Sequence, residues 1–187
     1  VYVRSIEDRS QTKFEVVREG DEYKDHETGE VLGYEALFIG SGLLKRIGDP
    51  ATLLLTATEQ ESVKGDRLLP VTEDVAIQNF QPKAPATNVN GAIISVLNGI
   101  TQIGQHDVVV VDRGASDGLT VGDILQINHR GATIKDAVTP DPGDTVTLPD
   151  EKAGIMMIFR TFDRVSFGLV MHATRAIHVM DKVVSAK

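Results

Sequence analysis

The chain has 187 residues, of which 41% are hydrophobic and 25% are charged, so it can bury one good core or two small ones and is not a disordered polypeptide. Its formal net charge of −8 argues against a nucleic-acid partner, because a phosphate backbone is bound by clustered Lys and Arg. The absence of Cys excludes disulfides and thiolate sites, and no apolar run approaches the roughly 18 residues of a membrane helix, so we expect no membrane insertion.

Alternating apolar and polar residues predict a strand in the first half of the chain. Leu53, Leu55, Ala57 and Val63 fall on one face, and the polar residues between positions 56 and 64 fall on the other. Turn signals follow one another at short intervals along the whole chain. Short strands with frequent turns predict an all-β fold made of small barrel-like or sandwich-like units.

Gly-Asp and Asp-Gly pairs are the clearest of these turn signals. Glycine adopts positive φ without steric cost, and an Asp side chain can hydrogen-bond the backbone of its own turn. We therefore expect a backbone-shaping role, and no chemistry, for six residues. They are Gly65, Asp66, Asp117, Gly118, Gly122 and Asp123.

A Pro-containing stretch at 79–90 is the one plausible linker, because Pro82 and Pro85 disfavour helix and remove ladder donors. We expect a first β unit at 1–80, a linker at 81–90 and a second β unit at 91–187. Within the second unit, Asn98-Gly99 predicts a tight hairpin between 92–97 and 100–103. The strand at 108–111 is apolar on both faces, so we expect it to lie centrally in the fold.

Residues 154–186 repeat the pattern of residues 33–71 imperfectly. In the second copy, residues 169–179 alternate like those of the first, with His172 and His178 on the outward face. Matching residues that keep their order predict an internal duplication, in which one supersecondary unit is used twice and length changes fall in surface loops. The matched pairs are Gly33 with Gly154, Phe38 with Phe159, Ala57 with Ala173, Thr58 with Thr174, Val63 with Val179 and Asp66 with Asp181.

The residues at 114–118 fit the Gly-x-Ser-x-Gly pattern of a hydrolase nucleophile elbow, with Ser116 as the nucleophile and His172 and His178 later in the chain. That elbow needs a helix after the serine. Here the following residues, GLTVGDILQIN, are β-branched, alternate in polarity and contain a second turn signal at Gly122-Asp123. We therefore interpret the pattern as a turn between two strands and expect no enzyme activity.

The five histidines and the acidic loop do not predict a metal site. His172 and His178 share a face, but six residues along one strand would separate them by roughly 20 Å, too far for one ion. We interpret His26, His106 and His129 as surface residues in turn-like surroundings. The acidic loop misses the spacing of a calcium-binding loop, so we expect neither a metal nor a cofactor. Its residues are Asp141, Asp144, Asp150 and Glu151.

Nearly the whole chain resembles one protein family. The segments are 29–71 (GEVLGYEALFIG…), 90–127 (NGAIISVLNGI…) and 148–184 (LPDEKAGIMMIF…). They resemble the region after the LysM module in LysM-domain proteins of the type IV pilus secretin-associated family. Residues 108–127, VVVVDRGASDGLTVGDILQI, also resemble the C-terminal domain of flagellar assembly protein T, in which an Asp-Gly turn and a Gly-Asp turn lead from one strand to the next.

The resemblance implies a bacterial periplasmic protein that binds peptidoglycan through a LysM module and accompanies the outer-membrane secretin. No segment of this chain resembles the short βααβ LysM unit. Because the chain begins at Val1 rather than Met, we expect a fragment or processed form, with that module upstream. By elimination, the chain itself is a candidate for contacting the secretin or a neighbouring copy of itself.

Two classes of function follow from these observations. The first is a non-catalytic scaffold that binds partners through exposed strand edges or an apolar patch. The second is a domain that binds or hydrolyses cell-wall carbohydrate, which would need a cleft with two carboxylates about 5 to 9 Å apart. Glu35, Asp112 and Glu151 are the carboxylates to test for such a separation.

Overall fold

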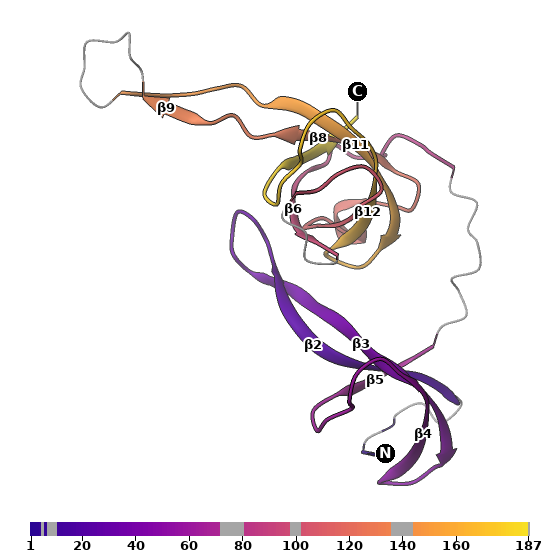
Figure 1. Cartoon of the computed structure of the whole chain (residues 1–187). Coiled ribbons are helices and arrows are strands. Elements are labelled where there is room, and N and C mark those ends of the chain that lie inside the picture. The colour runs from indigo at the N-terminus through magenta and orange to yellow at the C-terminus, as the bar shows by residue number, and fades with distance from the viewer. Residues whose placement is uncertain (5, 7–10, 72–80, 98–101, 136–143, 187) are drawn as a thin grey trace. The chain divides into compact units, whose positions relative to one another are not determined.

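The regular secondary structure of the described residues consists almost entirely of β-strands, as Figure 1 shows. A computed structural model describes residues 1–4, 6, 11–71, 81–97, 102–135 and 144–186. Within these ranges the helical structure is one 3-10 turn, η1 (Ala115–Asp117), and no helix is long and apolar enough to cross a membrane. The predicted all-β fold class is therefore confirmed.

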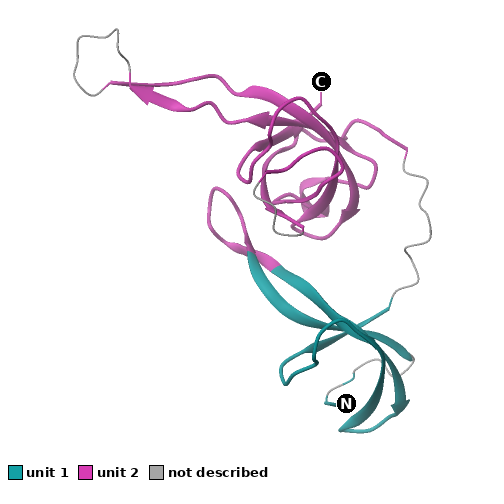
Figure 2. Cartoon of the chain, in the orientation of Figure 1, with its two compact units in different colours: residues 1–22, 34–78 teal, residues 23–33, 79–187 magenta. Residues whose placement is uncertain are grey.

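Contacts divide the chain into two compact units, which Figure 2 distinguishes by colour. The first comprises residues 1–22 and 34–78, and the second comprises residues 23–33 and 79–187. Residues 23–33 therefore belong with the second unit, although they fall inside the first by sequence. Residues 81–89 also contact the second unit, where the Lys83 N–H donates to the Gly122 carbonyl and the Ile124 N–H donates to the Lys83 carbonyl.

The first unit contains one five-stranded antiparallel sheet in the order β1-β4-β3-β2-β5. Alternate residues of its long strands point inward, which gives a small core around Phe14, Val16, Ile39 and Leu53. The strands are β1 (Tyr2–Val3), β2 (Lys13–Lys24), β3 (Val31–Arg46), β4 (Ala51–Thr58) and β5 (Arg67–Pro70). Strands β2 and β3 continue past this sheet, so that the turn between them lies in the second unit.

The second unit is a closed antiparallel barrel in the order β11-β12-β7-β6-β13-β8. Its core is formed by aliphatic side chains and Met156 from the inward faces of the strands. The barrel strands are β6 (Asn90–Val96), β7 (Val108–Val111), β8 (Ile124–His129), β11 (Glu151–Thr161), β12 (Ser166–Ala173) and β13 (Lys182–Ser185). Beyond β8 and β11, the chain continues as a two-stranded ribbon of β9 (Thr133–Lys135) and β10 (Thr145–Thr147).

The apolar character of β7 on both faces has a structural explanation. Val109 and Val111 belong to the barrel core, whereas Val110 packs with Tyr23 and Val165 in a separate buried cluster. The turn between β2 and β3 thus covers the outer face of β7, and both faces of the strand are removed from water. This arrangement agrees with the central position predicted for residues 108–111.

The two units repeat one strand topology. The sheet order β1-β4-β3-β2-β5 corresponds, strand for strand and in the same chain order, to β7-β12-β11-β8-β13 of the barrel. Strand β6 is the additional element that closes the second unit. Gly40 lies against the Ala57 carbonyl as Gly154 lies against the His172 carbonyl, and a Cβ added to either glycine would lie 2.4 Å from that oxygen. Gly40, rather than Gly33, is therefore the equivalent of Gly154.

Two details of the predicted strands are wrong. Strand β12 ends at Ala173 instead of running to Val179, because the Thr174 N–H and hydroxyl both turn to the Ala153 carbonyl. Likewise, β4 ends at Thr58, before Val63. Strand β6 pairs with β7, and the predicted Asn98-Gly99 hairpin turn lies outside the described residues.

We predict that Gly118→Val destabilises the second unit by about 1 to 3 kcal/mol. Gly118 has a φ of 87°, and a Cβ there would lie 2.7 Å from the Thr87 hydroxyl oxygen, so valine suffers both backbone strain and a clash. Urea unfolding followed by circular dichroism measures the loss. Gly33→Val is the matched control, because a Cβ at that position would have no neighbouring atom within 4 Å. Equal stability of the Gly118 variant and wild type would contradict the prediction.

Candidate functional site

One type of turn recurs at five places in the chain. In each, the N–H of a residue donates to the carboxylate of an Asp three positions later, and the Asp N–H donates back to the carbonyl of that residue. We call this arrangement the Asp turn. The five Asp turns span 63–66, 104–107, 114–117, 120–123 and 178–181.

The Asp turns set where strands begin. Strands β5, β7, β8 and β13 each start at the residue directly after the Asp of such a turn. In these four turns the third residue has positive φ, the conformation that the third residue of a type II turn requires. These residues are Gly65, His106, Gly122 and Met180.

The six turn residues singled out from the sequence all lie in or beside Asp turns. Gly65-Asp66 and Gly122-Asp123 are the last two residues of their turns. Asp117 closes the turn at 114–117, which contains η1, and Gly118 follows it with a φ of 87°. Ser116 donates its hydroxyl hydrogen to the Asp163 carbonyl, so its side chain ties this loop to the β11–β12 turn.

In the first unit, the Asp turn before β5 is closed by a bidentate ion pair. Arg18 on β2 donates from Nε to Asp66 Oδ1 at 2.8 Å and from Nη2 to Asp66 Oδ2 at 3.1 Å. These hydrogen bonds from Arg18, followed by that of the Val63 N–H, lower the pKa of Asp66 below its usual value. The charge of Asp66 is therefore compensated by a permanently positive side chain.

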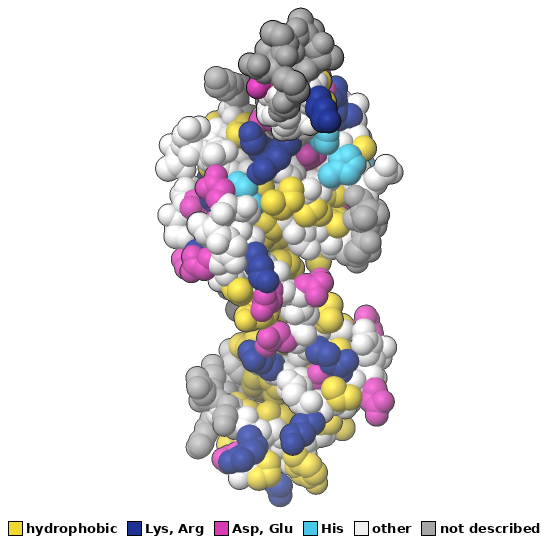
Figure 3. Space-filling model, turned by 90° about the vertical axis from the view of Figure 1, so that its left-hand side faces the viewer, with side chains coloured by type: hydrophobic (Ala, Val, Ile, Leu, Met, Phe, Trp, Pro, Cys, Tyr) yellow, Lys and Arg dark blue, Asp and Glu magenta, His cyan; other side chains and the backbone are white. Residues whose placement is uncertain are grey.

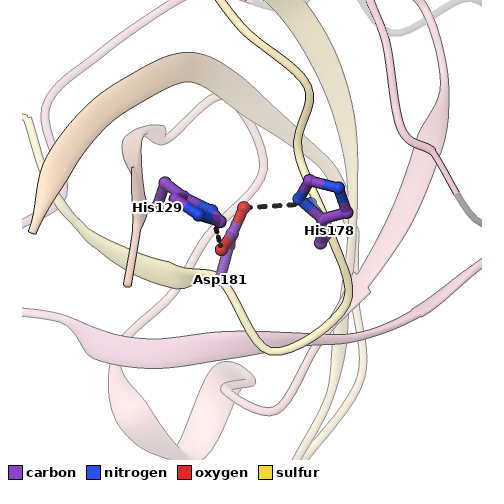
Figure 4. A group of neighbouring side chains, drawn as sticks. All are labelled: His129, His178 and Asp181. Carbon is purple, nitrogen blue, oxygen red and sulfur yellow. Dashed lines mark hydrogen bonds and ion pairs between the residues drawn. The ribbon is translucent and has the colours of Figure 1, made fainter. Parts of the chain in front are cut away.

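In the second unit, two imidazoles surround the equivalent Asp, as Figure 4 shows. Asp181, 3% exposed, accepts the His178 N–H on Oδ2 and lies 2.9 Å from His129 Nδ1 through Oδ1. The two imidazole rings are 5.5 Å apart between centroids and tilted by 54°. The buried Nδ1 of His178 has no hydrogen-bond partner. These three residues form the strongest candidate site in the described part of the chain.

His129 also lines a surface pocket of about 270 Å³ at the base of the β9–β10 ribbon. His129 and Glu151 are directly paired across the ladder between β8 and β11. On the face shown in Figure 3, histidine side chains lie close to Lys and Arg side chains. The remaining lining residues are Arg130, Gly131, Ala132, Leu148 and Pro149.

A second polar cluster fixes the β2–β3 turn to the barrel. Asp112 is 2% exposed and accepts hydrogen bonds from the His26 N–H, from His26 Nδ1 and from the Ala92 N–H. Arg113 Nη1 lies 3.1 Å from Asp25 and 3.4 Å from Asp112. Asp25 also accepts backbone hydrogen bonds from Thr28 and Glu27, and the Thr28 bond is the largest cause of its lowered pKa. Arg113 thus offsets one of the two carboxylate charges, and the hydrogen bonds of His26 and Asp112 tie the turn to the barrel.

The other histidines and acidic residues are distributed without a common site. His172 is exposed on β12 and, because that strand ends at Ala173, does not share a strand with His178. Asp150 pairs with Lys182 at 2.5 Å and has a lowered pKa, chiefly from that contact, while Glu151 pairs with Arg175. Asp144 is exposed, and Asp141 lies outside the described residues.

The sequence patterns did not predict that His129 and His178 lie close together. These residues are 49 positions apart and come from the end of β8 and the turn before β13, strands that pair only in the folded barrel. The internal repeat contained a partial signal, because it matched Asp181 with Asp66. The partner of each Asp could be assigned only from the strand register.

No protein-family model matches the chain, and no curated protein matches it either.

We predict that Asp66→Asn makes the free energy of unfolding less dependent on pH in the acidic range. The folded-state pKa of Asp66 is lowered, so its contribution to stability is present above the ordinary Asp pKa of about 3.9 and is lost as pH falls through the folded value. The variant should be less stable than wild type at pH 7, and the gap should narrow toward pH 2. Urea unfolding across that range measures it, and a gap that stays constant would contradict the assignment.

We predict that Asp112→Ala lowers the free energy of unfolding by about 3 to 5 kcal/mol, because it leaves the His26 and Ala92 N–H groups without their acceptor and removes a carboxylate beside Arg113. Glu30→Ala is the comparison variant, since it removes an exposed ion pair with Arg164 and should cost far less. Urea unfolding of both variants provides the measurement. Equal losses would mean that burial does not govern the strength of these contacts.

Proposed function

We propose that the chain is a non-catalytic interaction region of a periplasmic, peptidoglycan-anchored protein that associates with the outer-membrane secretin in type IV pilus biogenesis. The proposal rests on the resemblance of residues 29–71, 90–127 and 148–184 to the secretin-associated LysM family, and on one structural observation. That observation is the β9–β10 ribbon, which carries exposed apolar side chains.

The ribbon pairs only with itself among the described strands. Ile134 and Val146 are directly opposite each other in its ladder and are 45% and 46% exposed. On the same strands, the hydroxyls of Thr133 and Thr147 lie 3.0 Å apart in a polar cross-strand pair. A two-stranded ribbon is marginally stable in water, and its free edges and apolar pair are features that partner proteins use for strand addition and packing.

Two of the three carboxylates considered for a cell-wall hydrolase have other contacts. Asp112 is buried and accepts hydrogen bonds from two backbone N–H groups, and Glu151 is paired with Arg175. Glu35 lies on β3 in the first unit. A hydrolase would need two carboxylates that face a cleft about 5 to 9 Å apart. These contacts therefore favour the interaction role over carbohydrate hydrolysis.

Peptidoglycan anchoring is assigned to a LysM module outside these 187 residues. That βααβ module needs two α-helices, and the described residues contain only the 3-10 turn η1. In this proposal the LysM module binds peptidoglycan, and the present chain binds the secretin or another copy of itself.

We predict that the chain co-purifies with detergent-solubilised secretin and that Ile134→Thr with Val146→Thr lowers retention by about tenfold or more. Threonine keeps the β-branched shape but removes apolar surface, and partial burial of two aliphatic side chains is worth roughly 2 kcal/mol. Size-exclusion chromatography run in parallel measures self-association.

Leu54→Thr is the matched control, because Leu54 is an exposed apolar residue on β4 of the first unit. The control should be retained like wild type. Failure of wild type to co-purify, or equal retention of the ribbon variant, would contradict the proposal. Release of soluble fragments from purified peptidoglycan would instead support the hydrolase.

A further inference from the structure

We propose that His129, His178 and Asp181 form a binding site for Zn²⁺. Two imidazoles and a carboxylate are a donor set that zinc accepts, and each of the three residues offers one ligand atom within 4.8 Å of the others. This inference is independent of the proposed contact with the secretin.

The geometry of the two imidazoles fits a shared ion. With zinc–nitrogen bonds of about 2.0 Å, two imidazoles in tetrahedral coordination have ring centroids roughly 5 Å apart. His129 and His178 have centroids 5.5 Å apart. Asp181 lies between them, as Figure 4 shows, with Oδ1 at 2.9 Å from His129 Nδ1. Tetrahedral coordination places donor atoms roughly 3.3 Å apart, so side-chain rotation must draw the three donors together from separations of up to 4.8 Å.

The backbone holds the three residues in fixed positions. His129 is the last residue of β8, opposite Glu151 of β11. His178 and Asp181 are the first and last residues of an Asp turn directly before β13, which itself pairs with β8. A site whose ligands come from paired strands and a closed turn is preorganised, so little ordering is required when the ion binds.

The repeated architecture of the chain provides an internal comparison. Continued by one residue, the register of β2 with β5 places Arg18 next to Asp66. The register of β8 with β13 places His129 next to Asp181 in the same way, so Arg18 and His129 occupy equivalent positions. The Asp turns place Val63 at the position of His178. In the first unit the Asp is therefore neutralised by a permanent cation and the neighbouring residue is apolar.

In the second unit both equivalent positions carry imidazoles. An imidazole, unlike the guanidinium of Arg18 beside Asp66, carries no permanent charge, and the buried Nδ1 of His178 has no hydrogen-bond partner. A divalent cation would satisfy both requirements, because it would compensate the buried Asp181 carboxylate and use a histidine nitrogen as a ligand.

The surroundings leave room for a fourth ligand. The pocket lined by His129 and Glu151 adjoins the site, so a water molecule can complete a coordination shell with three protein ligands. Of the nearby cations, Arg175 and Lys182 are paired with Glu151 and Asp150, which reduces their repulsion of a metal ion, whereas Arg130 lines the pocket beside His129. The other candidate cluster, Asp25, His26 and Asp112, already holds a permanent cation, because Arg113 contacts both of its carboxylates.

The test is a calorimetric titration of the full chain with Zn²⁺, together with the visible absorption spectrum of the Co²⁺-loaded protein, which reports tetrahedral coordination. We expect one Zn²⁺ per chain. His129→Arg and His178→Val introduce the residues found at the equivalent positions of the first unit. The arginine gives Asp181 a charged partner, and the valine keeps the backbone N–H that the Asp turn requires. Each should weaken Zn²⁺ binding by at least about 100-fold, because loss of a ligand exceeds the 10- to 100-fold effect of a supporting residue.

His172→Ala is the matched control, because it removes an exposed histidine outside the cluster. It should bind Zn²⁺ and give the Co²⁺ spectrum like wild type. Circular dichroism melts of the metal-free variants establish that they are folded. The proposal is overturned if wild type binds no Zn²⁺, or if folded His129→Arg and His178→Val bind it as wild type does.

Discussion

The aspartate that closes each Asp turn is the constraint on which the two β units depend. Its carboxylate accepts a backbone N–H three residues earlier, and its own N–H completes the turn, so the direction of the next strand is set at its first residue. Four strands begin directly after such an Asp. Because the side chains of Asp66, Asp123 and Asp181 are nearly inaccessible, the charge of each must be compensated locally.

Both copies of the internal repeat retain the Asp turn before their last strand, whereas barrel closure and the charge partner of the Asp differ between them. Both units use the same order of five antiparallel strands, yet only the second adds β6 and closes into a barrel. A closed barrel has no free strand edge, whereas the five-stranded sheet retains edge strands at β1 and β5. The charge partner also differs between copies, since Arg18 contacts Asp66 and His129 contacts Asp181. One scaffold thus carries a permanent ion pair in one copy and an imidazole cluster in the other.

The outer surface of the barrel is used in two ways. Along β7, the turn between β2 and β3 buries Tyr23 against Val110 and is fixed by the polar contacts of Asp112. Beyond β8 and β11, the β9–β10 ribbon leaves Ile134 and Val146 exposed. The ribbon thus presents apolar surface, and the proposed zinc site includes His129, the residue at which β8 ends.

The sequence by itself determined the β class, because strand alternation and frequent turn signals are local properties of the chain. It also matched Asp66 with Asp181, but its match of Val63 with Val179 is one residue off, because the Asp turns align Val63 with His178. Only the tertiary structure decided which strands pair, that residues 23–33 join the second unit, and that His129 meets His178. Strand register and barrel closure join residues far apart in the chain, and local periodicity contains no information about which distant strand becomes the neighbour.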